Sequence, residues 1–166
     1  VYRSYGVTIF VTSVGTIFSM IVTSMLAYPL SIGSLKYKSL IAFFVFFTLI
    51  FSSGLVPWFL VVRRVYRLKD NLFALILPAL VNPWYMFLLR NYFRSIPSSM
   101  WESAKMDGAG DFLIFTRIAL PLSVPVLATI SLFYALFFWN DWWHALMLLD
   151  DRNLYPLQFQ LFIESR

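Results

Sequence analysis

Four long apolar runs, separated by charged or polar segments, dominate the pattern of hydrophobic and polar positions along this chain. They extend over about residues 6–30, 39–62, 71–89 and 120–149. The hydrocarbon core of a bilayer is about 30 Å thick, and a helix needs roughly 20 residues to cross it. The pattern therefore predicts an all-α membrane protein with four spans, and a polar segment, residues 90–119, before the last span.

The first run carries no charge and has small or hydroxyl residues at helical spacing. These residues recur at steps of three or four: Thr12, Thr16, Ser19, Thr23 and Ala27. On a helix they share one face, which favours close contact with another helix because small side chains let two backbones approach in lipid. Alternatively, the hydroxyls bond back to carbonyls of their own helix. We expect Pro29 and Gly33 to end the helix.

Glycine, serine and proline interrupt the next two runs. The segment 52–54 and Pro57 loosen the second run near its end. Pro78 and Pro83 each lack a backbone donor and should kink the third run. Asn82, between them, is expected near the middle of the membrane, where its amide would bond to a neighbouring helix or face a water-filled path.

Composition supports the membrane assignment. The 166 residues are 60% hydrophobic and 13% charged, and their mean hydropathy is +0.76, whereas a soluble domain needs more charge to cover its surface. The net charge of +5 comes from Lys and Arg at the ends of apolar runs, which suits anionic lipid headgroups better than nucleic acid. The chain has no Cys, which excludes disulfides and thiolate zinc sites.

The polar stretch Ser98–Pro125 predicts two short helices joined by a turn. Ser99 and Glu102 have the spacing of a capping box, with Ser as the cap and Glu three residues later. We therefore expect a first helix over residues 100–106. Gly108 is well placed to close it in the left-handed conformation.

The second helix of this stretch is expected over residues 112–120. Asp111 is the predicted cap, and Pro121 the residue at which the helix stops. Its apolar face would hold Phe115 and Ile118 together with either Leu113 or Ile114.

Residues at fixed offsets in this stretch resemble a known family motif. The matching residues are Glu102-Ser103-Ala104, Asp107-Gly108-Ala109, Phe115, Ile118 and Leu120-Pro121. They are similar to the EAA loop of permease subunits in bacterial ATP-binding-cassette (ABC) importers, whose form is EAA, then DGA, a Phe and Ile-x-Leu-Pro. Ser103 replaces the usual Ala, a small-for-small change.

Further segments resemble the carbohydrate-uptake, maltose-G-like permeases of that family, whose cargo is oligosaccharides and polysaccharide fragments. These segments are 51–57, 74–78, 90–93, 133–142 and 151–157. The resemblance implies a type I ABC-importer transmembrane domain in the bacterial plasma (inner) membrane, multi-pass. Residues 1–166 would be one permease domain, an internal piece holding spans two to five of six, with a cytoplasmic coupling loop at 90–119.

The resemblance also implies partners and a mechanism. A sibling permease would complete a heterodimer, a dimeric ATPase would bind ATP and Mg, and an extracytoplasmic solute-binding protein would deliver the cargo. This chain would bind no cofactor, metal or nucleic acid. Apart from these partner proteins, it would contact membrane lipid. The coupling helix would dock in a groove of the ATPase through the motif and its neighbours, namely Trp101, Glu102, Ser103, Ala104, Met106, Asp107, Gly108, Ala109, Phe115 and Pro121. Glu102 and Asp107 would pair with basic groups there, while Trp101, Ala104 and Met106 would supply apolar contact.

An aromatic and polar cluster near the end of the fourth run is a second candidate site. On an uninterrupted helix, Trp139, Trp142 and Trp143 share one face, and Asn140, Asp141 and His144 lie roughly opposite. Indoles stack on sugar rings, and amides and carboxylates bond sugar hydroxyls, so Trp139, Asn140, Asp141 and Trp142 could line a substrate path with Asn82. The alternative is an aromatic belt at the membrane interface. His144, the only histidine, is expected to be structural.

Charge does not decide the orientation of the chain. With the Ser98–Pro125 stretch placed in the cytoplasm, six basic residues lie inside and seven outside. The chain has no phosphate-binding loop, metal-ligating pair or catalytic triad, so we expect a transporter subunit without catalysis of its own, with ATP hydrolysed by the partner. Two alternatives stay open: an importer permease for amino acids, phosphate or metal chelates, and a membrane-bound enzyme or assembly factor.

Overall fold

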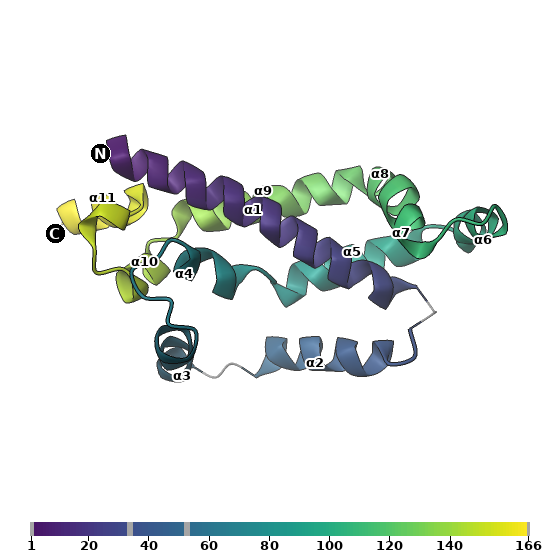
Figure 1. Cartoon of the computed structure of the whole chain (residues 1–166), viewed down its shortest axis with the longest axis horizontal. Helices are drawn as coiled ribbons and strands as arrows, with labels where there is room; N and C mark the ends of the chain where they lie inside the picture. The colour runs from purple at the N-terminus through teal and green to yellow at the C-terminus, as the bar shows by residue number, and fades with distance from the viewer. Residues whose placement is uncertain (1, 33–34, 52–53, 166) are drawn as a thin grey trace. The chain divides into compact units, whose positions relative to one another are not determined.

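The computed structural model describes residues 2–32, 35–51 and 54–165, and in this part of the chain it has helices and no strand (Figure 1). The α-helices are α1 (Tyr2–Ser31), α2 (Lys38–Ile50), α3 (Leu55–Leu60), α4 (Phe73–Ile76), α5 (Pro83–Ser95), α6 (Ser98–Met106), α7 (Asp111–Ile114), α8 (Leu120–Leu122), α9 (Val124–Asn140), α10 (Trp143–Leu148) and α11 (Leu157–Glu164). Two π-helical segments, Val61–Val65 and Phe115–Ala119, and two 3₁₀ turns, Leu77–Ala79 and Arg152–Leu154, complete the order. The all-α prediction agrees with this architecture.

Helix α1 is the one described helix that is long and apolar enough to cross a membrane by itself. Up to four crossings result if each of three bent helix pairs counts as one span. Ser19, Thr23 and Ala27 of α1 are fully buried, whereas Ile17, Phe18 and Ile21 are about half exposed. The face of small and hydroxyl residues is thus the packed face, and the large apolar side chains cover the other.

The hydroxyl groups of α1 differ in whether they bond to a carbonyl of their own helix. Thr8 donates to the carbonyl oxygen of Ser4 at 2.9 Å, as the back-bonding alternative requires. The buried hydroxyls of Thr12, Thr16 and Ser19 find no partner among the described residues. Helix-to-helix contact therefore explains this face better than hydroxyl back-bonding does.

The other predicted runs are interrupted helices. Within 39–62, helix α2 ends at Ile50 and α3 starts at Leu55, after Gly54 at a φ of 77°. Ser52 and Ser53, like Gly33 at the expected end of the first helix, lie outside the described residues. Residues 80–82 separate the turn after α4 from α5, which continues to Ser95, well beyond the expected 89.

Prolines account for part of these interruptions. Pro78 lies in a 3₁₀ turn and Pro83 is the first residue of α5, where its missing N–H would have no partner in any case. In the fourth run, helices α8, α9 and α10 are separated at Ser123 and at residues 141–142. Which of these helices cross the membrane remains a prediction.

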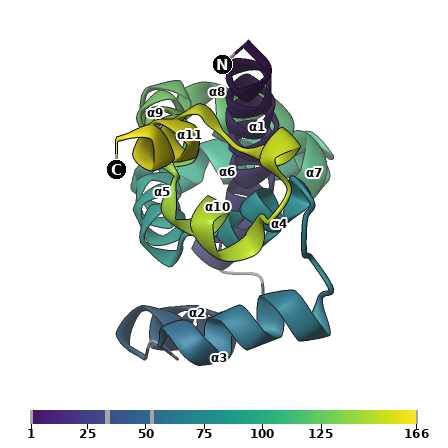
Figure 2. The ribbon, with the colours of Figure 1, turned by 90° about the vertical axis from the view of Figure 1, so that its left-hand side faces the viewer.

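The chain packs as two compact units. Unit 1 holds residues 2–19, 54–80 and 131–165, and unit 2 holds 20–51 and 81–130, within the described part. In unit 1, α4 and α10 lie side by side (Figure 2), and Val62, Ala74 and Leu148 form a buried cluster. Also in unit 1, a Cβ on Gly15 of α1 would lie 2.8 Å from the Phe138 ring of α9, so any larger residue at position 15 would force the ring to shift.

Candidate functional site

Helix α6, in unit 2, is the first helix of the candidate coupling loop. It spans Ser98–Met106 and is preceded by Pro97 in an extended conformation, with no side chain bonded to its first turn. The predicted capping box of Ser99 and Glu102 is therefore wrong. Because the helix starts at Ser98, Ser99 is already helical and cannot act as the cap.

The end of α6 forms as expected at Gly108. Its φ is +80°, in the left-handed region. The N–H of Gly108 donates to the carbonyl of Lys105 at 3.0 Å, and the N–H of Ala109 to that of Ala104 at 2.9 Å. These two bonds are those of the Schellman motif, which satisfies the last carbonyls of a helix and turns the chain sharply.

The second helix of the loop starts differently from the prediction. Asp111 is the first residue of α7 rather than its cap, and its carboxylate pairs with Lys105 of α6 at 3.5 Å. This ion pair is exposed and contributes at most about 1 kcal/mol. Helix α7 passes into the π-helical segment 115–119 and then α8, which ends at Leu122. Pro121 therefore lies inside the helical segment and does not stop it.

An aromatic cluster anchors this loop within unit 2. Tyr28 of α1 is 6% exposed, and its ring centroid lies 5.0 Å from that of Phe115, 6.0 Å from Phe93 and 6.2 Å from Trp101. One tyrosine thus touches α5, α6 and the segment after α7. Ile114 and Phe115 are buried and Leu113 is exposed, so Ile114 is the apolar-face residue of the two that the sequence left open.

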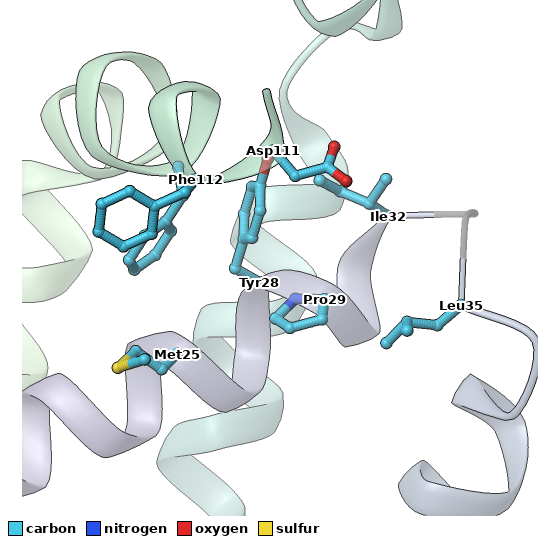
Figure 3. A pocket seen from close by; sticks show the side chains of 8 residues that line it. Met25, Tyr28, Pro29, Ile32, Leu35, Asp111 and Phe112 are labelled. Carbon is cyan, nitrogen blue, oxygen red and sulfur yellow. The ribbon is translucent and has the colours of Figure 1, made fainter. Parts of the chain in front are cut away.

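A crevice of about 260 Å³ opens beside this cluster. Figure 3 shows Tyr28 pointing from α1 toward Asp111 and Phe112, with Met25 and Pro29 on the same helix. The lining is apolar except for the Asp111 carboxylate and the Tyr28 hydroxyl, and the Phe112 ring is largely exposed. The loop therefore presents an apolar edge next to its charged outer surface.

Exposure divides the predicted coupling residues into two groups. The exposed ones are Glu102, Ser103, Met106, Asp107, Gly108 and Pro121, with Met106 at 88%. Ala104 is 9% exposed, Phe115 is buried, and Trp101 and Ala109 are partly covered. Ala104 and Trp101 thus support the loop from inside, and Met106 is the free apolar contact.

The tryptophan cluster of unit 1 does not lie on one continuous helix. Helix α9 ends at Asn140 and α10 begins at Trp143, so the predicted common face of Trp139, Trp142 and Trp143 is wrong. The Trp142 ring stacks on Phe162 of α11 at 4.5 Å. Trp139 is partly covered at the end of α9.

Asp141 and His144 form a pair at this break. Asp141, 9% exposed, accepts the backbone N–H of His144 at 3.1 Å, and its Oδ1 lies 2.8 Å from His144 Nδ1. The His144 ring packs against Trp58 at 5.1 Å. These contacts hold the start of α10, which agrees with a structural His144.

The amides of the predicted path bond to their own helices. Asn140 is exposed and donates its side-chain N–H to the carbonyl of Leu136 at 2.8 Å. Asn82 caps α5, its Oδ1 accepting the N–H of Trp84 at 2.9 Å. The capping role of Asn82 was missed, although Asn directly before Pro at a helix start is a recognisable signal.

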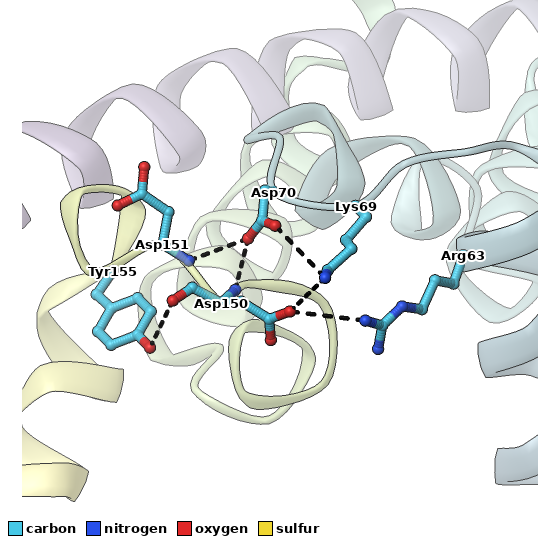
Figure 4. A network of polar contacts seen from close by, with 6 residues as sticks. All are labelled: Arg63, Lys69, Asp70, Asp150, Asp151 and Tyr155. Carbon is cyan, nitrogen blue, oxygen red and sulfur yellow. Dashed lines mark hydrogen bonds and ion pairs between the residues drawn. The ribbon is translucent and has the colours of Figure 1, made fainter.

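A polar network joins two loops of unit 1 (Figure 4). Asp70, at a φ of 51°, accepts the backbone N–H groups of Asp150 at 2.6 Å and Asp151 at 3.0 Å. Lys69 and Arg63 pair with the Asp150 carboxylate at 2.6 and 3.6 Å. The two N–H donors, first that of Asp150 and then that of Asp151, lower the pKa of Asp70 from its ordinary 3.8. The network therefore holds Asp70 as a carboxylate.

A comparison with protein families decides what kind of chain this is. Residues 7–160 match the model of the family described as binding-protein-dependent transport system inner membrane component. The chain belongs to this family. Its fold is that of a type I ABC-importer transmembrane domain, of which the described residues form part, and the polar loop with its Gly108 turn lies within the matched region.

The chain covers only part of the length of its named relatives. It is 46% identical over 161 residues to the polygalacturonan/rhamnogalacturonan transport system permease protein YtcP of Bacillus subtilis (strain 168), covering 97% of this chain and 56% of YtcP. It is 45% identical over 159 residues to Protein LplC of the same strain, with coverages of 96% and 54%.

A solved structure agrees closely. The chain matches part of a bacterial ABC transporter involved in the import of the acidic polysaccharide alginate, with a TM-score of 0.93 and 36% identity. The match covers 99% of this chain and 57% of that one. The chain thus spans about half the length of the proteins that it resembles.

Proposed function

We propose that this chain is part of a permease subunit of an ABC importer for carbohydrates, mainly oligosaccharides. The observation that carries the proposal is membership of the inner-membrane transport family over residues 7–160. Its named relatives include the galacturonan permease YtcP and an arabinooligosaccharide permease, AraQ of Bacillus subtilis, and its structural neighbour belongs to an alginate importer. A sibling permease, an extracytoplasmic binding protein and a dimeric ATPase would complete the machine.

The loop at residues 98–111 is the part that would couple this subunit to the ATPase. Glu102 and Asp107 are exposed on α6 and at its end, where they are free to meet basic groups of a partner. Met106 supplies an exposed apolar side chain beside them. The Tyr28 cluster ties α6 to α1, so movement of the loop would be passed to a helix of the membrane part.

ATP would be bound and hydrolysed by the partner. In this scheme the subunit contributes movement and a path rather than catalysis. Closure of the ATPase pair would pull on α6, and packed side chains would carry the displacement to α1. This agrees with the general rule that coupling passes through contiguous packed elements with two discrete arrangements.

In unit 1, Trp139, Asn140 and Trp142 are proposed to line the substrate path, with Asp141 in a supporting role. In unit 2, Asn82 is a separate candidate for the path. Asn140 is exposed, and its second amide hydrogen and its oxygen remain able to bond a sugar hydroxyl. Asp141 and Asn82 already hold helix starts, so their loss would act through the shape of the path.

The test is a charge reversal on the loop. In the complete importer, Glu102→Lys with Asp107→Lys should abolish co-purification of the ATPase and uptake of a labelled oligosaccharide, while the permease still inserts. Glu164→Lys, a single exposed reversal in unit 1, is the control for charge reversal away from the loop and should retain the ATPase. Normal co-purification and uptake after the double reversal would overturn the coupling role. Uptake of amino acids or phosphate in place of the oligosaccharide would overturn the cargo class.

A further inference from the structure

A basic pocket in unit 2 lies apart from the coupling loop and the tryptophan cluster. It is lined by the end of α1, by residues between 38 and 46 of α2 and by residues between 87 and 94 of α5, and has a volume of about 620 Å³. Lys38, Arg90 and Arg94 contribute three positive charges, and no carboxylate lines it. None of the three forms an ion pair with any residue that the structure describes.

The arginine at the centre of the pocket is held in place. Arg90 donates its Nε–H to the carbonyl of Leu30 at 2.9 Å, and its guanidinium lies 5.8 Å from the centroid of the Phe87 ring. Its two terminal amino groups make no hydrogen bond with the described residues. A guanidinium fixed in this way presents a planar pair of donors, which is the arrangement that binds phosphate oxygens in bidentate fashion.

The pocket is charged at one end and aromatic at the other. Lys38 is the first residue of α2, and Phe43 and Phe46 lie about 7 and 12 Å further along that helix, at 1.5 Å per residue. On α5 the order is reversed, because Phe87 precedes Arg90 and Arg94. Helices α2 and α5 are in contact, and the Phe46 and Phe87 rings lie 6.2 Å apart between their centroids, so the rings of the two helices meet in one part of the pocket.

We propose that this pocket binds the phosphate headgroup of an anionic membrane lipid, with an acyl chain against the phenylalanines. Free phosphate has the same charged oxygens as a lipid headgroup but no apolar part that could contact the phenylalanine rings. The aromatic end of the pocket therefore favours a lipid over free phosphate. Basic pockets between membrane helices bind anionic headgroups, and each Lys or Arg near an anionic membrane surface contributes about fivefold in affinity, which we take as the scale here. The site would hold α2 against α5 in the bilayer.

The test compares lipid binding by the complete importer and by two double variants of equal charge. Lys38→Gln with Arg94→Gln removes two pocket charges and spares Arg90, whose bond to Leu30 supports the fold. Arg64→Gln with Arg117→Gln removes two exposed charges elsewhere. Binding is measured by native mass spectrometry and by thermal stabilisation with phosphatidylglycerol, phosphatidylcholine or inorganic phosphate.

The pocket variant should bind phosphatidylglycerol about 30-fold more weakly than the parent, whereas the control should lose little. Phosphatidylcholine should stabilise all three proteins equally, and inorganic phosphate should stabilise none. Equal losses in both double variants would mean a diffuse surface charge effect and overturn the proposal. Stabilisation of the parent by inorganic phosphate as strong as that by the lipid would overturn the lipid assignment.

Discussion

Two glycines of the proposed coupling loop offer a sharp test, because they differ in backbone conformation and in little else. Gly108 has a φ of +80°, whereas Gly110, two residues later, has a φ of −73°. A Cβ added at either position would meet nothing within 4 Å. Any difference between Gly108→Ala and Gly110→Ala therefore reports backbone strain and not a steric clash.

The expected magnitude follows from the conformation. An L-residue in the left-handed region costs roughly 1–2 kcal/mol, a factor of about 5–30 in an equilibrium constant. Gly110→Ala should instead stabilise by about 0.4–1 kcal/mol, since the alanine fits the native conformation and the unfolded chain loses freedom. Gly108→Asn should lie between, because Asn tolerates the left-handed region better than Ala.

Amide hydrogen exchange measures this effect without depending on transport. The N–H groups of Gly108 and Ala109 bond to the last carbonyls of α6, so their protection reports closure of the turn. We expect Gly108→Ala to lower protection of these amides about 5- to 30-fold, and Gly110→Ala to leave it equal or higher. If the two alanine variants exchange alike, the left-handed turn is not what closes α6.

Three further perturbations probe other parts of the chain. Gly15→Ala should destabilise the purified permease by about 1–3 kcal/mol, because its Cβ meets the Phe138 ring. Gly6→Ala, on the same helix, should stabilise the permease. Equal melting temperatures of the two variants would contradict the close approach of Gly15 to Phe138. Tyr28→Ala should cost about 2–4 kcal/mol, but Tyr28→Phe less than about 1 kcal/mol, because the buried hydroxyl has no partner among the described residues; chemical unfolding checks this order. Asp70→Asn keeps a residue suited to a positive φ and removes the charge. Because the pKa of Asp70 in the folded protein lies below 3.8, the stability that this charge contributes is present above pH 3.8 and is lost as the pH falls through the folded pKa. The melting temperatures of this variant and the parent should therefore differ at neutral pH and converge in acid, and a constant difference down to the most acidic pH would refute the role of the charge.

Local signals in the sequence were enough to predict the turn at Gly108 in the proposed coupling loop. Gly108 follows a short helix and precedes a second one, and a left-handed glycine is the common way to end such a helix. The start of α6 was harder, because Ser99 and Glu102 have the capping-box spacing but the helix starts at Ser98, two residues too early for Ser99 to be its cap. Tertiary packing can move a helix end by two residues, and the spacing of residues in the sequence does not predict such a shift.

The break between α9 and α10 shows the same limit. Residues 120–149 form one apolar run, and hydropathy does not distinguish a continuous helix from three short ones. The buried Asp141 carboxylate accepts the N–H of His144 and starts a new helix, which reorients Trp142 toward Phe162. The hydrogen bond at the break is local, but the stacking partner of Trp142 lies twenty residues further along the chain, and hydropathy does not indicate it.

The sequence by itself determined the class of the molecule: membrane helices, a polar loop with the EAA spacing and a left-handed glycine, because these depend on composition and local geometry. Only the tertiary structure decided which side chains face inward. It buried Ala104, placed Tyr28 among three aromatic rings and gathered Lys38, Arg90 and Arg94 from two helices into one pocket. Such contacts join residues up to 87 positions apart, as between Tyr28 and Phe115. A local sequence pattern cannot predict which distant side chain packs against a given residue.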